Sequence, residues 1–313
     1  MRDGSFGGLA VILGLFLTLT ATPAFAQSTR TLIDSRESLY NNIYVYREGP
    51  YVSMTFGYNQ RIYTESIYNT QDDRDLPVPY TRYMTESLIY AKNIRSILEI
   101  GFGGGRTSWY LHRFLPNVPV TSVELDPAVL ELSKKYFGIR DEPNFKVINQ
   151  DGRIFLTESK DKYDVILIDA YRGPFVPFHL LTKEFYQLVK SHLAEGGVVV
   201  QNVEPSTMLF DSAVKTINSV FPQMDFYVAE GNVVTVAYDG PPKSPDDLQK
   251  VAAQRQAQYG FRFDLTQMFG DRRRLPPDLG TTIDPNAKVL TDDFAPVEAL
   301  KAIENHNRKW PDK

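Results

Sequence analysis

Short, mostly apolar runs alternate with longer mixed segments through the middle of the chain. The runs lie at residues 97–100, 145–148, 163–168 and 197–202. A further strand is expected to end at the acids Glu124 and Asp126. Short apolar runs bounded by turn residues indicate buried strands, and strands that alternate with helices indicate a parallel sheet with helices on both faces. We therefore predict an α/β domain over residues 79–240.

The end of this domain departs from the parallel pattern. A helix is expected over residues 206–220, and the sequence DFYVAEGNVVTVAY that follows has two strand-like runs around Glu230-Gly231-Asn232. Such a pair predicts an antiparallel β-hairpin. A mostly parallel sheet that ends in this way is typical of a class I S-adenosylmethionine-dependent transferase, whereas a dehydrogenase usually continues with parallel strands. We predict this Rossmann-like fold class.

The segments on either side of this domain differ from it in composition. Residues 27–78 are rich in Tyr, Val, Ile and Thr, with turn residues between the runs. This composition favours short strands joined by hairpins, so we predict a small N-terminal β domain. A helix is expected from Tyr80 to Tyr90. Residues 241–313 are predicted to form a C-terminal extension that packs on the α/β domain, with one helix near residues 244–258.

The N-terminal residues have the pattern of a secretory signal peptide. Arg2 precedes an apolar run at residues 9–19 and a small-residue site, Ala24-Phe25-Ala26. This order predicts a signal peptide over residues 1–26 and export to the periplasm or the medium. The run is too short to span a bilayer comfortably, so no stable membrane span is expected after cleavage. A membrane anchor formed by the uncleaved segment and a misassigned start codon are the alternatives.

Composition and charge exclude several classes of site and partner. The formal net charge is -4, which does not favour a nucleic-acid partner, and Arg272-Arg273-Arg274 is predicted to be solvated loop charge. The chain has no cysteine, so disulfides, thiolate metal sites and a cysteine nucleophile are excluded. Its 4 histidines are scattered along the sequence, and we expect no metal.

Glycines cluster where the first predicted strand of the α/β domain ends. Gly101, Gly103, Gly104 and Gly105 form this turn, and Glu124 follows further along the chain. Glycines let the backbone turn sharply and approach a ligand, and an acid roughly 20 residues on can accept hydrogen bonds from ribose hydroxyls. The spacing predicts that the chain binds an adenosine-containing molecule. A tight strand-to-helix turn without a ligand is the alternative.

Further acids stand at the ends of later predicted strands. Asp151 and Gly152 come just after the third strand, and Asp169 follows the fourth. Ligands bind at the carboxyl ends of the strands in an open α/β sheet. We therefore expect Glu124, Asp151 and Asp169 to face one cavity near Gly101. Asp169 could instead only cap the loop after its strand.

Motifs spread over most of the chain carry a family resemblance. They are PYTRYM (79–84), LEIGFGGG (98–105), VELDPAVLELSKKYFG (123–138), DGRIFL (151–156), DVILIDAY (164–171), VPFHLLTKEFYQLV (176–189) and LTDDFAPVE (290–298). With them the chain resembles the spermidine synthase (polyamine aminopropyltransferase) superfamily, and most closely its bacterial spermidine synthase-like branch. The resemblance implies an enzyme that moves an aminopropyl or related group from an S-adenosylmethionine-type sulfonium to an amine.

The resemblance also implies a donor site. The co-substrate would be S-adenosylmethionine or decarboxylated S-adenosylmethionine, with no metal. The loop from Gly101 to Gly105 would lie under the nucleoside and its sulfonium. Glu124 resembles the acid that binds both ribose hydroxyls. Asp151, with the backbone of Gly152, resembles the adenine-binding pair.

An acceptor site is implied in the same way. Asp169 resembles the catalytic aspartate that accepts a proton from the attacking amine, and Tyr80 resembles a tyrosine of the amine pocket. Gln71 stands at about the distance of a pocket glutamine. A carboxylate is required because an alkylamine is protonated at neutral pH. The implied partner is a small-molecule amine, a polyamine, and family members commonly pair as homodimers through such strand domains.

Some residues depart from the family pattern. Gly104 stands where the family has an aspartate that binds the amine of the decarboxylated donor, and Arg172 replaces the second aspartate after the fourth strand. Thr81 replaces the histidine beside the pocket tyrosine. Glu99 is typical of methyltransferases, although it could instead bind backbone N–H groups of the glycine loop. A methyltransferase and a non-catalytic exported polyamine or nucleoside binding protein are therefore the alternative functions.

Other polar residues have mainly structural interpretations. Asp292 and Asp293 could form a helix N-cap or a lid over the pocket. His179 is expected to start or cap a helix after Pro177 rather than act as a base. Trp109 is expected to pack in the core.

Overall fold

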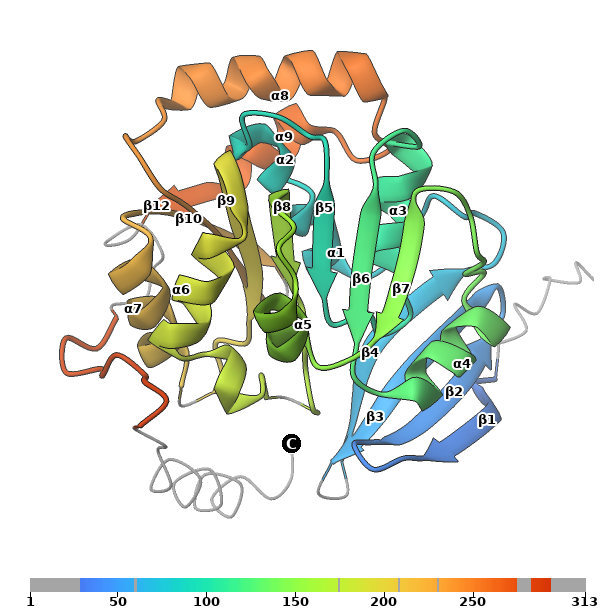
Figure 1. The fold of residues 1–313 in the computed structure, drawn as a ribbon. Helices are drawn as coiled ribbons and strands as arrows, with labels where there is room; N and C mark the ends of the chain where they lie inside the picture. The colour runs from blue at the N-terminus through green and yellow to red at the C-terminus, as the bar shows by residue number, and fades with distance from the viewer. Residues whose placement is uncertain are drawn as a thin grey trace, which may run out of the picture.

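Two β-sheets make up the framework of the protein. The computed structural model describes residues 29–58, 61–173, 175–207, 209–229, 231–274 and 283–293. In these ranges a four-stranded antiparallel sheet stands beside a larger mixed sheet that is flanked by helices (Figure 1). The predicted signal peptide, residues 1–26, lies outside the described residues. Within them no helix combines the length and the apolar character that a membrane crossing requires.

The larger sheet has the topology predicted for a Rossmann-like transferase. Its strands are β5 (Ile97–Ile100), β6 (Val120–Glu124), β7 (Phe145–Asn149), β8 (Tyr163–Ile168), β9 (Leu193–Val203), β10 (Gln223–Ala229), β11 (Asn232–Tyr238) and β12 (Arg272–Arg274). They are arranged in the order β12-β10-β11-β9-β8-β5-β6-β7. The run from β9 to β7 is parallel, and β11 and β10 continue it as an antiparallel hairpin. The predicted hairpin is therefore confirmed.

Helices cover both faces of this sheet, as expected for buried parallel strands. They are α1 (Pro79–Met84), α2 (Ser87–Tyr90), α3 (Arg106–Phe114), α4 (Pro127–Tyr136), α5 (Gly152–Glu158), α6 (Lys183–Ser191), α7 (Phe210–Val220), α8 (Pro245–Tyr259) and α9 (Leu265–Met268), with short 3₁₀ turns η1 (Phe178–Leu180) and η2 (Phe269–Asp271). One apolar core contains residues of α1, α2, α3, α4, α8 and α9. The other contains residues of α5, α6 and α7.

The prediction of a single helix from Tyr80 to Tyr90 is wrong, because the segment forms two short helices, α1 and α2. Between them the backbone N–H groups of Thr85 and Glu86 bond to carbonyls three residues back rather than four. The hydroxyl of Thr85 donates to the carbonyl of Arg82 at 2.6 Å and competes for the helical acceptors. The predicted helix at 206–220 also begins later, at Phe210.

The prediction that Arg272-Arg273-Arg274 lies in a loop is also wrong, although Arg273 and Arg274 are exposed to solvent as expected. These residues form β12, which pairs with β10 at the edge of the sheet. Arg272 Nε donates to Asp225 Oδ2 at 2.7 Å, and the Asp225 side chain is only 3% exposed. A buried carboxylate requires a partner, and that requirement holds the arginine against the sheet.

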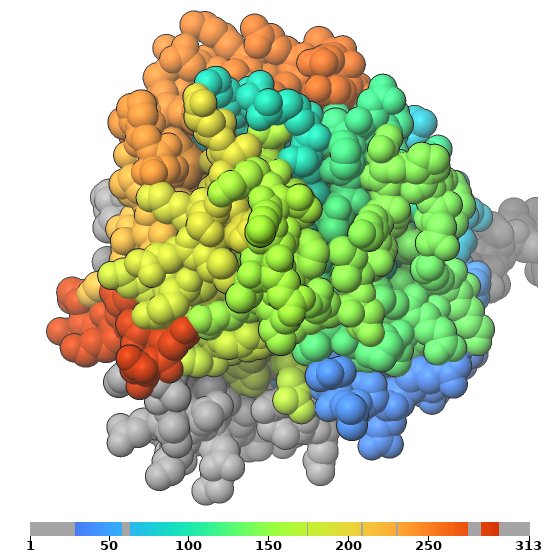
Figure 2. Space-filling view, viewed as in Figure 1, coloured from blue at the N-terminus to red at the C-terminus, as the bar shows by residue number. Residues whose placement is uncertain are grey.

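The N-terminal sheet packs against the larger unit rather than standing apart. Its strands β1 (Thr31–Glu37), β2 (Asn42–Glu48), β3 (Tyr51–Tyr58) and β4 (Arg61–Asn69) are arranged in chain order. Its inward side chains, which include Val45 and Met54, belong to the same core as Trp109. Figure 2 shows the sheet in blue against the green residues of the larger unit. The predicted core position of Trp109 is confirmed. The domain boundaries at residues 78 and 240 stay a prediction.

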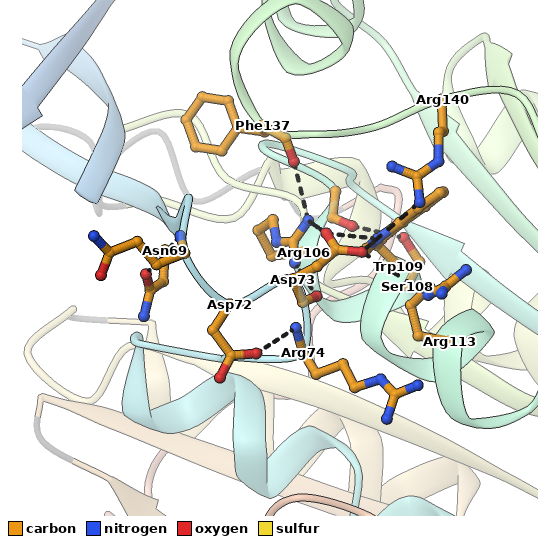
Figure 3. A network of polar contacts seen from close by, with 12 residues as sticks. Asn69, Asp72, Asp73, Arg74, Arg106, Ser108, Trp109, Arg113, Phe137 and Arg140 are labelled. Atoms are coloured by element: carbon orange, nitrogen blue, oxygen red, sulfur yellow. Dashed lines mark hydrogen bonds and ion pairs between the residues drawn. The ribbon is translucent and has the colours of Figure 1, made fainter. Parts of the chain in front are cut away.

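The connection from β4 to α1 is tied to α3 by a network around Asp73 (Figure 3). The Asp73 carboxylate accepts a hydrogen bond from Trp109 Nε1 at 3.0 Å and one from Arg106 Nη1 at 3.4 Å. Arg113 and Arg140 lie within 4.0 Å of the same carboxylate. The network fixes β4 relative to the start of α3, which follows the glycine turn.

Candidate active site

A cavity of about 640 Å³ opens at the carboxyl ends of the parallel strands. The predicted residues that line it are Tyr80, Gly101, Gly103, Glu124, Asp151, Gly152 and Asp169. The expectation that the three acids at strand ends would face one cavity is therefore confirmed. Ligand cavities commonly have volumes of roughly 300–1,000 Å³, so the space suits an adenosyl sulfonium.

Gly104, Gly105 and Gln71 were also expected at the site, but they lie outside this lining. Gly105 is the N-cap of α3, where its φ is +69° and a Cβ would lie 2.2 Å from the ring of Phe102, so the position requires glycine. Its role is to shape the turn. Gln71 lies in an exposed turn, and its N–H donates to Asn69 Oδ1 at 3.1 Å. The expectation that Gln71 would be a pocket glutamine is wrong, because the chain after β4 turns away from the cavity.

The glycine turn brings the backbone of β5 against the end of β8. Gly101 has φ +88°, and a Cβ there would lie 2.4 Å from the carbonyl oxygen of Asp169. Gly101 N–H donates to the carbonyl of Val123 at 2.9 Å. Only glycine combines this positive φ with so close an approach. The turn therefore sets the distance between Asp169 and Glu124, because it touches both strand ends.

Glu124 holds the turn through backbone hydrogen bonds. Its Oε2 accepts from the N–H of Phe102 at 2.9 Å and of Gly103 at 3.3 Å, and its Oε1 accepts from Asp126 N–H at 2.9 Å. Burial raises the pKa of Glu124, and these N–H groups partly offset the rise. Oε2 accepts two N–H groups and Oε1 only one, so Oε1 keeps an acceptor site to which a ribose hydroxyl could donate.

Asp151 caps α5 and binds a histidine. Its Oδ1 accepts from the N–H groups of Arg153 and Ile154, both at 2.9 Å, and its Oδ2 lies 2.9 Å from His179 Nε2. Burial favours a higher pKa for Asp151, but the His179 hydrogen bond and the helix N–H groups prevail and lower it. At Gly152 a Cβ would lie 2.3 Å from Ile100 Cγ2, so the helix approaches β5 closely.

His179 lies in η1 just after Pro177, as predicted. The sequence did not indicate its contact with Asp151. Arg153, which follows the α5 N-terminus, also forms a salt bridge with Asp292, and its Nη1 lies 2.8 Å from Asp292 Oδ1. Leu290, two residues earlier, is buried and accepts from Lys183 N–H at 2.8 Å. A helix capped by Asp292 or Asp293 would lie beyond the described residues.

Asp169 is held between two donors at the floor of the cavity. Its Oδ2 accepts from the Tyr80 hydroxyl at 3.0 Å, and its Oδ1 accepts from Asn202 Nδ2 at 3.1 Å. Asn202 is oriented in turn by Asn232 Nδ2, 3.0 Å from its Oδ1. Burial raises the pKa of Asp169 to about 6, against the opposing effect of both hydrogen bonds. A carboxylate of this kind can take a proton near neutral pH.

Sequence reasoning missed several residues of this site. Asn202 is the last residue but one of β9, so a search for polar residues near strand ends could also have found it. Tyr40, Asn41 and Glu65 line the cavity from the N-terminal sheet and its connections, where no local sequence pattern indicates a ligand. The cavity is therefore built from both sheets.

Glu99 does not bind the glycine turn, although that was one of its two expected roles. The N–H groups in question donate to Glu124 instead. Glu99 is buried in β5 and accepts from the Ser122 hydroxyl at 2.9 Å. Burial raises the pKa of Glu99 to about 8. It lines a small adjoining cavity together with Glu65 and Asp169.

The described residues hold no group of three or more His, Asp or Glu side chains arranged to bind a metal ion.

Comparisons with known proteins agree with this geometry. A family model for the spermine/spermidine synthase domain matches residues 79–235. A polyamine aminopropyltransferase of Vibrio vulnificus is 29% identical over 306 residues, which cover 95% of this chain and 100% of that protein.

Two solved structures share the fold. A probable spermidine synthase from Corynebacterium glutamicum aligns with a TM-score of 0.64 at 19% identity, over 84% of this chain and 97% of that one. Human methyltransferase-like protein 13, solved in complex with SAH, aligns with a TM-score of 0.52 at 24% identity, over 62% and 93%. The family match includes the glycine turn, Glu124, Asp151 and Asp169. The chain belongs to the spermine/spermidine synthase family.

Proposed function

We propose that this protein is an aminopropyltransferase that moves the aminopropyl group of decarboxylated S-adenosylmethionine to a polyamine-type amine. The observation that carries the proposal is the placement of Asp169. Its carboxylate lies in the same cavity as the glycine turn, Glu124 and Asp151, and is held by Tyr80. Family membership and the full-length match to a polyamine aminopropyltransferase support the same reaction.

The donor would bind along the ends of β5, β6 and β7. The ribose hydroxyls would donate to Glu124, and the adenine amino group would donate to Asp151. The glycine turn would lie beneath the sulfonium, because Gly101 and Gly103 line the cavity with backbone atoms alone. A sulfonium carbon is already activated for substitution, so the chain mainly has to orient the two reactants.

The acceptor would enter as an ammonium and give one proton to Asp169. With a pKa of about 6, Asp169 is ionised above that pH and able to accept the proton. The neutral amine attacks the carbon beside sulfur, so that a C–N bond forms while the C–S bond breaks. The bonding pair goes to sulfur and methylthioadenosine leaves. Tyr80 keeps its proton, because burial and the neighbouring Asp169 raise its pKa well above the ordinary value.

A product assay tests the proposal. The purified protein would be incubated with putrescine and either decarboxylated or intact S-adenosylmethionine, and the released nucleoside would be identified by mass spectrometry. Aminopropyl transfer releases methylthioadenosine from the decarboxylated donor. Failure to form methylthioadenosine with any of a panel of amines would refute the proposal.

Methyl transfer from intact S-adenosylmethionine is the second candidate. Arg172 lines the cavity and is exposed, so it offers a cation to a carboxylate such as intact S-adenosylmethionine carries. The same assay separates the two reactions, because methyl transfer releases S-adenosylhomocysteine. Release of that product alone would favour the second candidate.

We also propose that residues 1–26 direct export of the protein. The support is the sequence pattern of Arg2, the apolar run and Ala24-Phe25-Ala26. Fractionation of cells that express the full chain with a C-terminal tag would test this, together with N-terminal sequencing. Export with cleavage gives a periplasmic or secreted chain that begins at Gln27. An intact chain in the membrane fraction would identify an anchor instead.

A homodimer formed through the N-terminal sheet is proposed on the family resemblance. Leu32 and Tyr51 of this sheet are 50% and 42% exposed and would be covered by such pairing. Sedimentation velocity of the wild type and of Leu32→Glu tests it. A wild type that sediments as a monomer at high concentration would contradict it.

A further inference from the structure

Glu65 is a carboxylate of the cavity that the proposed reaction does not yet use. The register of β3 and β4 passes from Met54↔Ser66 to Thr55↔Thr64, so Glu65 is the extra residue of a β-bulge. A bulge redirects a side chain out of the regular alternation of a strand. Glu65 lines both the main cavity and the small one beside it.

One carboxylate oxygen of Glu65 is left without a hydrogen-bond donor from the described residues. This atom is Oε1, and it is buried. Burial raises the pKa of Glu65, and the charges of Asp169 and Glu124 raise it further. Arg106 lines the small cavity, and its Nη atoms donate to Asp73 and to the carbonyl of Phe137, while its Nε has no acceptor among the described residues. Burying a carboxyl oxygen without a hydrogen-bond donor lowers the stability of the folded protein. A cationic group of a ligand could supply the missing donor.

The neighbour of Glu65 explains why the glycine turn has no acid of its own. The N–H of Gly104 donates to Ser66 Oγ at 2.8 Å. A Cβ at Gly104 would lie 2.7 Å from Ser66 Cβ and 2.7 Å from Phe137 Cδ1. No aspartate fits at this position while β4 and Phe137 stay in place. Ser66 of β4 thus occupies the space beside the turn, and the residue before it, Glu65, lines the cavity.

We infer that Glu65 binds the primary ammonium of the donor's aminopropyl group and thereby selects decarboxylated over intact S-adenosylmethionine. The inference rests on the proposed aminopropyl transfer and assigns to β4 the function that an aspartate in the glycine turn would have. Intact S-adenosylmethionine carries a carboxylate beside the same amine. The bound ammonium would hold Glu65 ionised, and the carboxylate of intact S-adenosylmethionine would then lie near the like charges of Glu65 and Asp169 and be repelled. An ammonium instead forms a charge-assisted hydrogen bond.

Among the described residues, His179 and Arg172 are the basic side chains that line the main cavity. His179 Nε2 lies 2.9 Å from Asp151 Oδ2, and Arg172 is an exposed residue of the connection that follows Asp169. The amine of the donor is therefore the group best able to neutralise Glu65.

Calorimetric titration of the purified wild type and of Glu65→Gln tests the inference. The ligands are decarboxylated S-adenosylmethionine, intact S-adenosylmethionine and methylthioadenosine, which lacks the aminopropyl group. We expect Glu65→Gln to weaken the decarboxylated donor at least tenfold and to leave methylthioadenosine within about twofold. The preference for decarboxylated over intact donor should fall by the same factor. Glu65→Asp, which keeps the charge but shortens the side chain, should lose less.

Glu86→Gln is the matched control. Glu86 is another buried glutamate whose carboxylate has no hydrogen-bond partner among the described residues, but it does not line either cavity. The control should leave the affinities of all three ligands unchanged. A loss of donor affinity in Glu86→Gln equal to that in Glu65→Gln would show a general effect of removing a buried charge and would overturn the inference.

The remaining outcomes also decide the question. Wild-type affinity of Glu65→Gln for the decarboxylated donor would overturn the inference and leave the proposed reaction standing. So would a variant with unchanged donor affinity but a raised KM for the acceptor amine. Equal loss of methylthioadenosine affinity would assign Glu65 a structural role and would also overturn it. A wild type that binds no decarboxylated donor would overturn the inference and the proposed function together.

Discussion

Replacement of Asp169 by asparagine separates the chemistry of the site from its construction. Asparagine has the same shape, and its carbonyl oxygen can keep the hydrogen bond from Asn202 Nδ2, now 3.1 Å from Asp169 Oδ1. Its amide nitrogen would face the Tyr80 hydroxyl, which can accept as well as donate. The variant should therefore fold and retain the cavity while it loses the ability to accept a proton.

The magnitude of the stability change follows from the pKa of Asp169. Burial raises that pKa from 3.8 to about 6, so the folded state holds the proton more tightly than the unfolded state. At pH values above both the unfolded-state and the folded-state pKa, a shift of this size lowers the free energy of unfolding by about 3 kcal/mol. The contribution is present below pH 3.8 and is lost as the pH rises through about 6. Asp169→Asn should thus be more stable than the wild type at pH 8, by up to about 3 kcal/mol, with a smaller gain at pH 4.

Activity should change in the opposite direction. Loss of a general base typically costs about 100- to 10,000-fold in rate. We expect kcat of Asp169→Asn to fall within this range, while methylthioadenosine affinity stays within about tenfold, or about 1.4 kcal/mol. In the wild type, kcat/KM should fall as the pH drops below about 6, because protonated Asp169 cannot accept the proton.

Three measurements check the reasoning. They are urea unfolding at pH 4 and pH 8, methylthioadenosine release across pH, and calorimetry of ligand binding. Wild-type turnover in Asp169→Asn would remove this residue as the base. If the residual activity of Asp169→Asn falls below about pH 6 as wild-type activity does, the group that titrates there is not Asp169.

Three further substitutions test the construction of the site. Gly101→Ala should lower the free energy of unfolding by about 2–4 kcal/mol in urea titration, because φ is +88° and a Cβ would lie 2.4 Å from the Asp169 carbonyl oxygen; wild-type stability would contradict this. Asp73→Ala should cost about 2–4 kcal/mol, because it leaves Arg106 and Trp109 Nε1 without their carboxylate, and a loss below about 0.5 kcal/mol would show that the network is dispensable. Burial raises the pKa of Glu86, so the stability that its protonated form contributes is lost as the pH rises through that pKa. In urea titration, the free energy of unfolding of Glu86→Gln should exceed that of the wild type by more at pH 9 than at pH 5, and an equal difference at the two pH values would refute this.

Glu124, Asp151 and Asp169 could be predicted because each lies at the end of a strand or shortly after it. Parallel pairing sets these ends level, since Ile100 is opposite Val123 in β6 and Ile168 in β8. Apolar runs identified the strands, and position after the run identified Glu124 and Asp169. Nothing beyond local pattern and sheet geometry was required.

Residues that depend on contacts between distant segments were not predictable in this way. Glu65 enters the cavity through a bulge, and a bulge depends on how two strands match along their length. Arg272 joins the sheet because Asp225 is buried at its edge, which no local pattern reveals. Gln71 was placed by its distance from Tyr80 along the chain, and that distance fails because the turn after β4 carries it to the surface.

The glycine at position 104, where the family has an aspartate, is interpreted differently once the packing of the two sheets is known. From the sequence it removes an amine-binding acid and favours intact S-adenosylmethionine. In the fold, Ser66 and Phe137 occupy the space that a side chain at Gly104 would need, and the carboxylate of Glu65 stands beside them. Introducing aspartate at position 104 would consequently push β4 away from the turn rather than restore a lost contact. The donor specificity of this chain therefore depends on the packing of the N-terminal sheet against the glycine turn, and a change in either should alter it.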